Sequence, residues 1–214
     1  MNYIIKNSGE VFKLLLEHLQ MTGLAMLIAV AIALPLALLV TRYCWLNIPV
    51  LGFLGTLYTI PSLALIILLV PIFGLNRQSV VVAMVIYTQV ILVRNFSVAL
   101  QSIAPEILEA ARGMGMNFWQ RWWWVEMPLI LPICLAGVRL AAIVAIAIAT
   151  IGAKFGAGGL GVLLFDGVAQ VRNDKIWAGA IMVAILAFAV NGMLLGWERL
   201  STPSLKIRQV FRVN

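Results

Sequence analysis

The glycine-rich run Gly156-Ala157-Gly158-Gly159-Leu160-Gly161 has the spacing of a nucleotide-binding loop. It fits G-x-G-x-x-G, in which glycines let the backbone approach a pyrophosphate at a helix N-terminus. That chemistry needs a β-strand before the loop, and here a long apolar run of helical character precedes it. We therefore interpret Gly156, Gly158, Gly159 and Gly161 as a tight turn or close helix contact with a packing or gating role, and not as a nucleotide site.

Two other groups of side chains could bind a solute or an ion. Trp119, Trp122, Trp123 and Trp124 could form a cation–π cage around a quaternary ammonium group. Tryptophan is also enriched where helices leave the membrane, and we favour that interpretation. Arg139 lies well inside an apolar run, where a charge is costly and often functional. It could line a pathway or pair with another subunit, but we favour a side chain that reaches back to the lipid headgroups.

The motifs of several enzyme classes are missing from the chain. It has no G-x-x-x-x-G-K-[ST] loop, so ATP hydrolysis on a P-loop of its own is excluded. It has no serine nucleophile elbow, and His18, Cys44 and Cys134, its one histidine and two cysteines, follow no metal-ligand pattern. We expect neither an enzyme nor a metal or cofactor bound to this chain.

Composition places the chain in a membrane. Hydrophobic residues make up 63% of the 214 residues and charged residues 11%, whereas soluble domains carry about 25% charged residues. Much of the net charge of +7 lies in the tail, at Arg199, Lys206, Arg208 and Arg212. Such a tail suits a cytoplasmic membrane flank, so the charge does not indicate a nucleic-acid partner.

Apolar runs predict an all-α polytopic membrane protein with about five transmembrane helices, because a span needs about 20 residues. They form one membrane domain, 19–200, between an amphipathic segment, 1–18, and a basic cytoplasmic tail, 201–214. An odd number of spans and the basic tail put the N-terminus outside and the C-terminus in the cytoplasm. Residues 156–171 could dip into the bilayer or form a further span. The expected spans are 19–40, bent or tilted at Pro35, 50–70, with Pro61 inside it, 79–93, 129–151 and 176–197.

The most polar long interval separates two apolar halves and predicts two short helices. Pro105 suits the first turn of a helix, where a missing N–H costs nothing. Glu106 and Glu109 come early, where the helix dipole favours negative charge. Gly113 and Gly115 can both end this helix in the left-handed conformation.

The second short helix of this interval is predicted from its cap. Asn117 and Gln120 have capping-box spacing, so the helix should begin at Phe118. Pro128 and Pro132 should then reset the chain before the next span. Two short helices joined by a glycine turn form a compact knob that a soluble partner could grip.

Glu109-Ala110-Ala111, Gly115 and Val125-Glu126-Met127-Pro128 together resemble the EAA loop of importer-type ABC transporter permeases. The family pattern is EAA, three residues, Gly, nine residues and I-x-L-P, and the spacing matches in full. In that family the loop seats in a cleft of a separate ATP-hydrolysing subunit. The resemblance implies that Glu109 docks, that the two alanines keep the docking surface thin and that Gly115 makes the turn. It implies a coupling loop, 95–128, with the coupling residues Glu106, Glu109, Ala110, Ala111, Gly115, Met116 and Pro128.

Three further stretches, ATIGAKFGAGGLG, YTIPSLAL and VRNF, resemble permeases for glycine betaine, choline, carnitine and related osmoprotectants. The resemblance implies a methionine-permease-like arrangement of helices in the bacterial cytoplasmic membrane. It implies two ATP-binding subunits that carry the ATP and Mg, a second permease subunit, identical or paralogous, and an extracytoplasmic solute-binding protein. A lone secondary carrier or channel is the alternative. Gly192 and Gly196 have a spacing that allows close helix packing, within the chain or between subunits.

Overall fold

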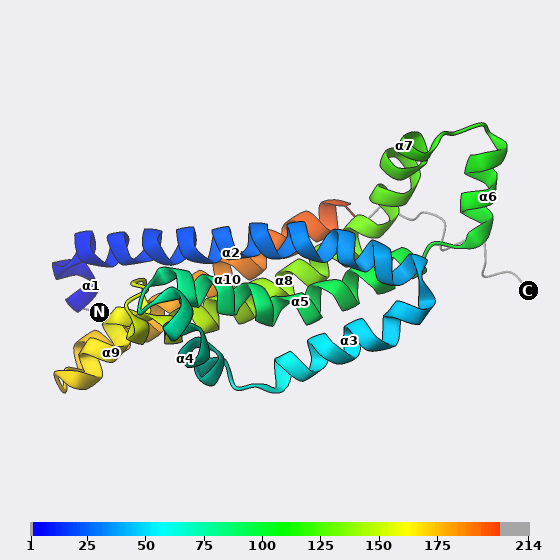
Figure 1. Cartoon of the computed structure of the whole chain (residues 1–214). Helices are drawn as coiled ribbons and strands as arrows, with labels where there is room; N and C mark the ends of the chain where they lie inside the picture. Colours follow the sequence, from blue (N-terminus) through cyan, green and yellow to red (C-terminus); the bar gives the residue numbers. More distant parts are fainter. Residues whose placement is uncertain (1, 202–214) are drawn as a thin grey trace, which may run out of the picture.

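The computed structural model describes residues 2–201, and these contain helices and turns without any strand, which confirms the all-α prediction. The helices run between two ends of an elongated bundle (Figure 1). We call the end that carries α6 and α7 the hairpin end and the end near residue 2 the opposite end. The elements are α1 (Asn2–Lys6), α2 (Ser8–Arg42), α3 (Cys44–Thr59), α4 (Ser62–Phe73), α5 (Arg77–Gln101), α6 (Pro105–Gly113), α7 (Phe118–Arg121), a π-helix (Trp122–Glu126), α8 (Met127–Gly152), a 3-10 turn (Ala153–Phe155), α9 (Gly161–Ala169) and α10 (Asn173–Ser201).

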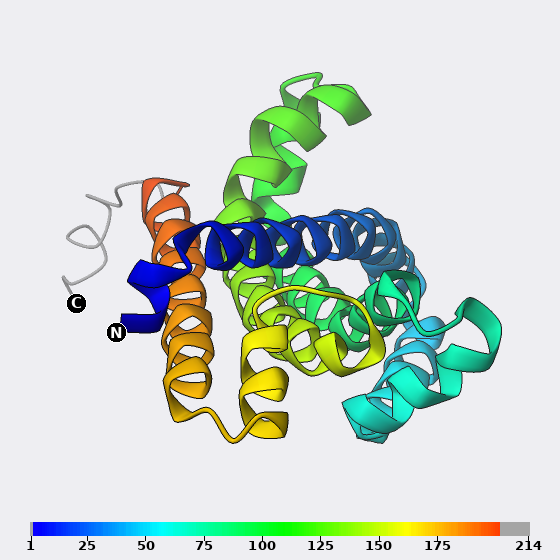
Figure 2. The same ribbon diagram turned by 90° about the vertical axis from the view of Figure 1, so that its left-hand side faces the viewer.

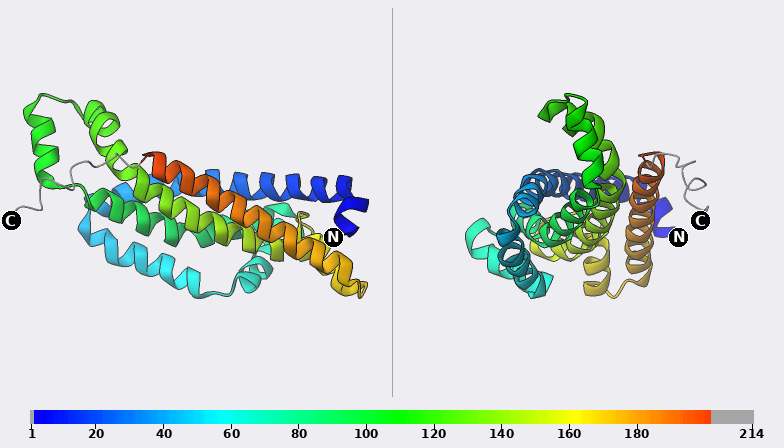
Figure 3. Two further views of the ribbon diagram at one scale, coloured as in Figure 1. Left: turned by 180° about the vertical axis from the view of Figure 1, so that it is seen from behind. Right: turned by 90° about the vertical axis from the view of Figure 1, so that its right-hand side faces the viewer.

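The long helices alternate in direction. α2, α5 and α10 run toward the hairpin end, and α3 and α8 run back, as two opposed views show (Figures 1 and 3). Within residues 2–201, four helical paths are long and apolar enough to cross a membrane, and α3 with α4 makes a fifth if the bent pair counts as one. This agrees with the predicted number of about five. The two ends of the described chain therefore lie at opposite ends of the bundle.

The prediction of one continuous span over 50–70 is wrong. The chain bends by 95° between α3 and α4. Pro61 causes the break, because it has no N–H to donate and forces the preceding residue out of the helical region. Ile60 accordingly has φ −66° and ψ 125°, which is extended. A view along the bundle shows α3 and α4 on one flank and α10 on the other (Figure 2).

The first transmembrane helix is much longer than its apolar run. α2 has 35 residues, which corresponds to about 50 Å, whereas the hydrocarbon core of a bilayer is about 30 Å thick. Residues 8–18, predicted as part of an amphipathic segment, continue directly into the span, and only α1 turns away. Pro35 lies inside α2 without interrupting it.

Small residues let α2, α5 and α8 pack closely. α2 turns an alanine toward the core at every fourth position, and each is at most 1% exposed: Ala25, Ala29, Ala33 and Ala37. Gln89 of α5 donates its Nε2 to the Ala29 carbonyl over 3.1 Å. On α8, a Cβ at Gly137 would lie 2.6 Å from the Cβ of Asn95, so the contact with α5 requires glycine. These three helices therefore form a filled core that holds the loops at both ends.

The glycine-rich run forms a turn at the opposite end, as predicted. Gly156, Gly158 and Gly159 have φ of 75°, 77° and 81°, a left-handed conformation that glycine adopts without strain. The turn is tied to α2, because Glu17 Oε2 accepts the Gly159 N–H over 3.2 Å. The fully buried His18 accepts the next backbone N–H through Nδ1 over 3.3 Å. Nothing in the sequence pattern indicated these two partners.

The segment after this turn does not form an additional span. α9 has nine residues, which correspond to about 14 Å, less than half of the hydrocarbon thickness. It packs against α10 at the opposite end of the bundle (Figure 1). The expectation of a further span within 156–171 is therefore wrong, since only a short helix is present.

Candidate functional site

The hairpin of α6 and α7 carries the predicted coupling residues. Pro105 occupies the first turn of α6 and Glu106 follows it, as predicted from the helix-start signals. Glu106, Glu109 and Ala110 are exposed. Ala111 is only 2% exposed, so the expectation that both alanines keep the outer surface thin is wrong for this residue. The exposed surface of α6 thus includes two carboxylates and a methyl group, together with the side chains of Ile107 and Arg112.

Gly115 makes the turn between the two short helices. Its φ is 76°, and its N–H donates to the Arg112 carbonyl over 2.9 Å. The N–H of Met116 donates to the Ala111 carbonyl over 3.2 Å. This pair of bonds is a Schellman motif, which satisfies carbonyls at a helix end and needs a left-handed residue. Gly113 was the alternative stop, but it is still helical.

The second helix begins where the capping signal predicts. The Asn117 side chain accepts the Gln120 N–H over 2.9 Å, and the Gln120 side chain accepts the Asn117 N–H over 2.9 Å. The two reciprocal bonds form a capping box and fix the direction in which α7 leaves the turn. The predicted start at Phe118 is confirmed.

The fourth span is continuous with α7, and the prediction that two prolines reset the chain is wrong. Residues 118–155 form one helical path, with a π-helix at Trp122–Glu126 directly before α8. Pro128 lies in the first turn of α8 and Pro132 lies inside it. Because Pro128 cannot donate the usual i to i−4 bond, a π-bulge just before it accommodates the missing donor. A movement of α7 is therefore transmitted directly into a transmembrane helix.

An ion pair braces this π-helix. Arg121 Nε lies 2.6 Å from Glu126 Oε1, and the two side chains are only 17% and 13% exposed. The Arg121 guanidinium also lies 5.7 Å from the ring centre of Phe118, a cation–π contact. The sequence analysis missed this brace. Arg121 and Glu126 are five residues apart, so their side chains face each other only if the segment is a π-helix. No local sequence signal predicted a π-helix here.

The tryptophans of this region do not surround a common space. Trp122 is buried between the base of the hairpin and the bundle, whereas Trp119, Trp123 and Trp124 are 66%, 57% and 69% exposed. Within residues 2–201 these four rings make no ring contact with one another. This agrees with the view that they do not form an aromatic cage.

Arg139 pairs within the chain, which neither sequence-based interpretation anticipated. Its Nε lies 3.1 Å from Glu198 Oε2, and its guanidinium is 3.5 Å from Asn191 Oδ1. Both partners belong to α10, so the contact joins α8 to α10. Because membrane helices gain little from hydrophobic contact with each other, a polar contact of this kind helps to hold them together.

A double-mutant cycle tests this contact. We expect Arg139→Met and Glu198→Gln each to lower the thermal unfolding midpoint in detergent. The double variant should lose less stability than the two single variants lose together, which corresponds to a coupling energy of about 1 kcal/mol. Additive losses would show that the pair contributes nothing to stability.

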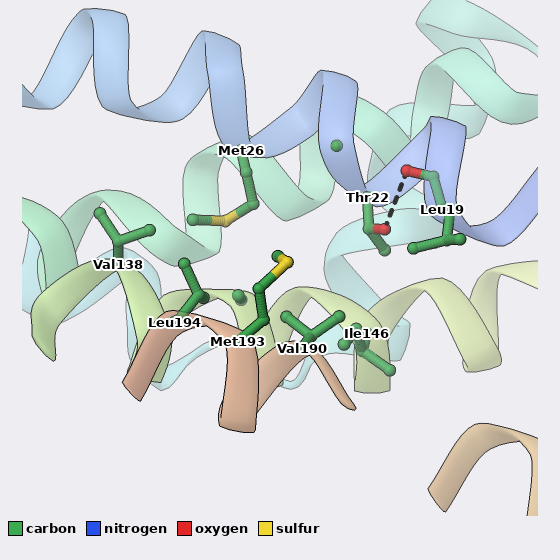
Figure 4. A pocket seen from close by; sticks show the side chains of 10 residues that line it. Leu19, Thr22, Met26, Val138, Ile146, Val190, Met193 and Leu194 are labelled. Carbon is green, nitrogen blue, oxygen red and sulfur yellow. Dashed lines mark hydrogen bonds between the residues drawn. The ribbon is translucent and has the colours of Figure 1, made fainter. Parts of the chain in front are cut away.

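A shallow apolar groove separates α2 from α10 on the side of the bundle (Figure 4). Its volume is about 210 Å³, and Met26 of α2 faces Met193 and Leu194 of α10 across it. The one hydrogen bond drawn there runs from the Thr22 hydroxyl to the Leu19 carbonyl over 3.2 Å. The groove therefore offers apolar surface and no charged group to a solute.

Gly192 and Gly196 of α10 have no close partner within residues 2–201. A Cβ added at Gly192 or Gly196 would meet no atom within 4 Å. The alternative that they serve an internal helix contact is therefore wrong for residues 2–201. A contact with another subunit stays a prediction.

Comparison with known proteins gives these features a family context. The family model described as "Binding-protein-dependent transport system inner membrane component" matches residues 25–206. The chain is 39% identical over 207 residues to the osmoprotectant import permease protein OsmW of Salmonella typhimurium, covering 94% of this chain and 96% of that protein. It is 32% identical over 203 residues to the glycine betaine/carnitine/choline transport system permease protein OpuCB of Bacillus subtilis, covering 95% of this chain and 94% of that protein.

Solved structures share the fold. An inward-facing structure of the MetNI methionine ABC transporter superposes with a TM-score of 0.81 at 23% identity, covering 92% of this chain and 98% of that chain. An amino acid ABC transporter superposes with a TM-score of 0.69 at 20% identity, covering 92% and 95%. The predicted methionine-permease-like arrangement is confirmed.

Proposed function

The chain belongs to the family of inner-membrane components of binding-protein-dependent transport systems, and on this premise we propose that it is the permease subunit of an ATP-driven importer for quaternary-ammonium osmoprotectants. The observation that carries the proposal is the hairpin at one end of the bundle. Its exposed carboxylates, Glu106 and Glu109, stand on α6, and Gly115 joins that helix to a path that continues into α8. A partner that moves the hairpin moves a transmembrane helix with it.

The ATPase is proposed as a separate pair of subunits that bind ATP and Mg. The absence of a P-loop from the sequence supports this division of labour. Each ATPase subunit would contact α6 through Glu109 and Ala110, with Gly115 and Met116 shaping the turn and Pro128 lying at the base of α8. Closure of the two ATPase subunits would then bring two hairpins together and switch the bundle between two states.

The remaining partners lie in and beyond the membrane. A second permease subunit, identical or paralogous, is proposed to complete the path, and the open face around Gly192 and Gly196 can accept a close helix contact. The hairpin end faces the cytoplasm in this proposal, with residue 2 outside. An extracytoplasmic solute-binding protein would meet the opposite end, near α9 and the glycine-rich turn.

The proposed solutes come from the relatives. The relatives' names refer to osmoprotectants, glycine betaine, carnitine and choline, and the last three compounds share a trimethylammonium group. Uptake of these three compounds, measured in cells that lack their own osmoprotectant carriers, tests the assignment. Transport without any requirement for an ATPase would instead indicate a lone carrier.

Charge reversal at the docking face tests the coupling role. We expect Glu109→Lys to lower solute uptake roughly tenfold or more, because reversed charge at a docked interface costs several kcal/mol. The protein should still reach the membrane, since Glu109 is exposed and outside the bundle core. Uptake, membrane amount and co-purification with the ATPase are measured together.

Lys13→Glu is the matched control for membrane amount and co-purification with the ATPase, because Lys13 is an exposed charge on α2 far from the hairpin. Normal uptake by Glu109→Lys would refute the docking role of this face. If the unaltered chain co-purifies with no ATPase subunit, the importer assignment itself fails.

A further inference from the structure

A large cleft lies between the hairpin and the bundle. Its volume is about 820 Å³, and the end of α2, the end of α5, α6 and α7 all contribute to it. One part of the lining is apolar and includes Leu38 of α2, Leu100 of α5 and Ile103, which lies just after α5. The other part consists of charged side chains from the hairpin and from the last residue of α2. A ligand that fits this cleft must therefore combine apolar and ionic groups.

The charged part of the cleft is cationic. Arg42, Arg112 and Arg121 line it together with Glu126. Arg121 is neutralised by Glu126 at 2.6 Å. The side chains of Arg42 and Arg112 make no ion pair or hydrogen bond within residues 2–201. Two guanidinium groups are thus available to an anion.

A polar atom at the cleft also lacks a partner. The Oγ1 of Thr41, which lines the cleft, is buried and makes no hydrogen bond within the described part of the chain. Buried hydroxyl groups nearly always have a partner, from the protein, from water or from a ligand. Thr41 directly precedes Arg42 and both residues line the cleft, so the unpartnered hydroxyl belongs to the neighbour of one of the two available guanidinium groups.

A second, apolar pocket of about 270 Å³ adjoins the cleft. The two share Pro35, Leu38 and Phe118, and the second pocket continues over Trp119 and Trp122. An acyl chain could follow this surface while its headgroup stays at the arginines. Free phosphate or a nucleotide would leave the apolar pocket without an occupant.

We propose that this cleft binds one anionic phospholipid, with its phosphate between Arg42 and Arg112 and an acyl chain along Leu38 and Phe118. Basic pockets at the ends of transmembrane helices suit such headgroups, because the hairpin end, with the cytoplasmic orientation proposed above, meets the leaflet that is rich in anionic lipid. Guanidinium groups also match phosphate oxygens in geometry.

The lipid and the proposed ATPase contact occupy different faces of α6. Leu108 and Arg112 are four residues apart and face the cleft. Glu106 and Ala110 point away from these two residues, whereas Glu109 lies on the flank of the helix, three residues before Arg112, and all three are exposed. A bound lipid would therefore brace the hairpin against α2 without blocking the docking face. The inference shares the proposed orientation of the hairpin end with the proposed function, but it does not depend on which solute is carried.

Lipid retention measured on the full chain tests the site. The chain is purified in detergent, incubated with phosphatidylglycerol or phosphatidylcholine, and examined by native mass spectrometry. We expect retention of phosphatidylglycerol in preference to phosphatidylcholine. The Arg42→Gln/Arg112→Gln double variant should bind phosphatidylglycerol roughly 30-fold more weakly, from about 1 kcal/mol for each lost charge. The matched control is Arg199→Gln, an exposed arginine at the hairpin end that does not line the cleft, and it should bind as the unaltered chain does.

Three results would overturn the proposal. The first is that the unaltered chain shows no preference for phosphatidylglycerol. This result does not depend on whether any variant folds. Another is equal binding by the double variant and by Arg199→Gln. The third is displacement of the lipid by millimolar glycerol phosphate or inorganic phosphate, which would indicate a site for soluble phosphate. If the double variant does not fold, the single variants Arg42→Gln and Arg112→Gln replace it, and each should bind phosphatidylglycerol about fivefold more weakly than Arg199→Gln does.

Discussion

Replacing Gly115 by valine is expected to leave the protein in the membrane and to reduce solute uptake about 5- to 30-fold. The residue has φ 76° in the Schellman turn between α6 and α7. A β-branched side chain in the left-handed region costs about 1–2 kcal/mol. A Cβ at this position would meet no atom within 4 Å, so the penalty comes from the backbone and not from a clash. The population of correctly shaped hairpins falls, and apparent affinity for the ATPase falls with it.

The control for this prediction is Gly115→Asn. Asparagine adopts the left-handed conformation more readily than other residues with a side chain, so this variant should keep most of the uptake. Both variants are compared by uptake, by ATP hydrolysis of the purified complex and by the amount of protein in the membrane. Equal uptake by the valine and asparagine variants would show that the left-handed turn is not required.

Replacing Gly161 by alanine is expected to destabilise the bundle itself. A Cβ there would lie 2.1 Å from the Thr150 carbonyl oxygen and 2.8 Å from the Cβ of Ala153. The first of these is backbone, which cannot move aside as a flexible side chain can. Overpacking of this kind costs about 1–3 kcal/mol, which for a chain of this size lowers the unfolding midpoint by roughly 5 °C. Thermal unfolding in detergent and the yield of monodisperse protein measure the effect.

Gly9→Ala is the matched control, because a Cβ at this α2 position meets nothing within 4 Å. Alanine has a higher helix propensity than glycine, so this variant should be at least as stable as the unaltered chain. If Gly161→Ala unfolds at the same temperature as Gly9→Ala, the close approach of α9 to α8 does not determine stability.

The hairpin and the filled core together explain how a small docking surface could act on the whole bundle. The path from Phe118 to Phe155 is helical throughout, so force applied at α7 is carried along α8. α8 in turn packs against α5 and α10 and is linked to α10 by Arg139 and Glu198. A closely packed interior transmits such a displacement with little loss. The proposed lipid would lie where the hairpin meets α2, at the start of this path.

The hairpin was largely predictable from the sequence, because its signals are local. Pro105 at a helix start, the left-handed Gly115 and the capping box of Asn117 with Gln120 act over at most a few residues. Their energies depend on neighbouring backbone groups and not on distant ones. The apolar runs likewise predicted membrane helices, since every backbone polar group in a bilayer must be satisfied within the protein. The ends of these helices were predicted less well, because a helix can continue through polar residues beyond the apolar run, as α2 does over residues 8–18.

Only the tertiary structure decided which residues meet across the bundle. Leucine and alanine runs have no unique partner, so the sequence could not show that Arg139 reaches Glu198 or that Glu17 holds the glycine-rich turn. It could not separate a kink from a 95° break at Pro61 either, because that depends on how α4 packs. The arginine-lined cleft arises from four separate segments. Local patterns determine where helices begin and end. Contacts between distant segments depend instead on how all the helices pack together in the bundle.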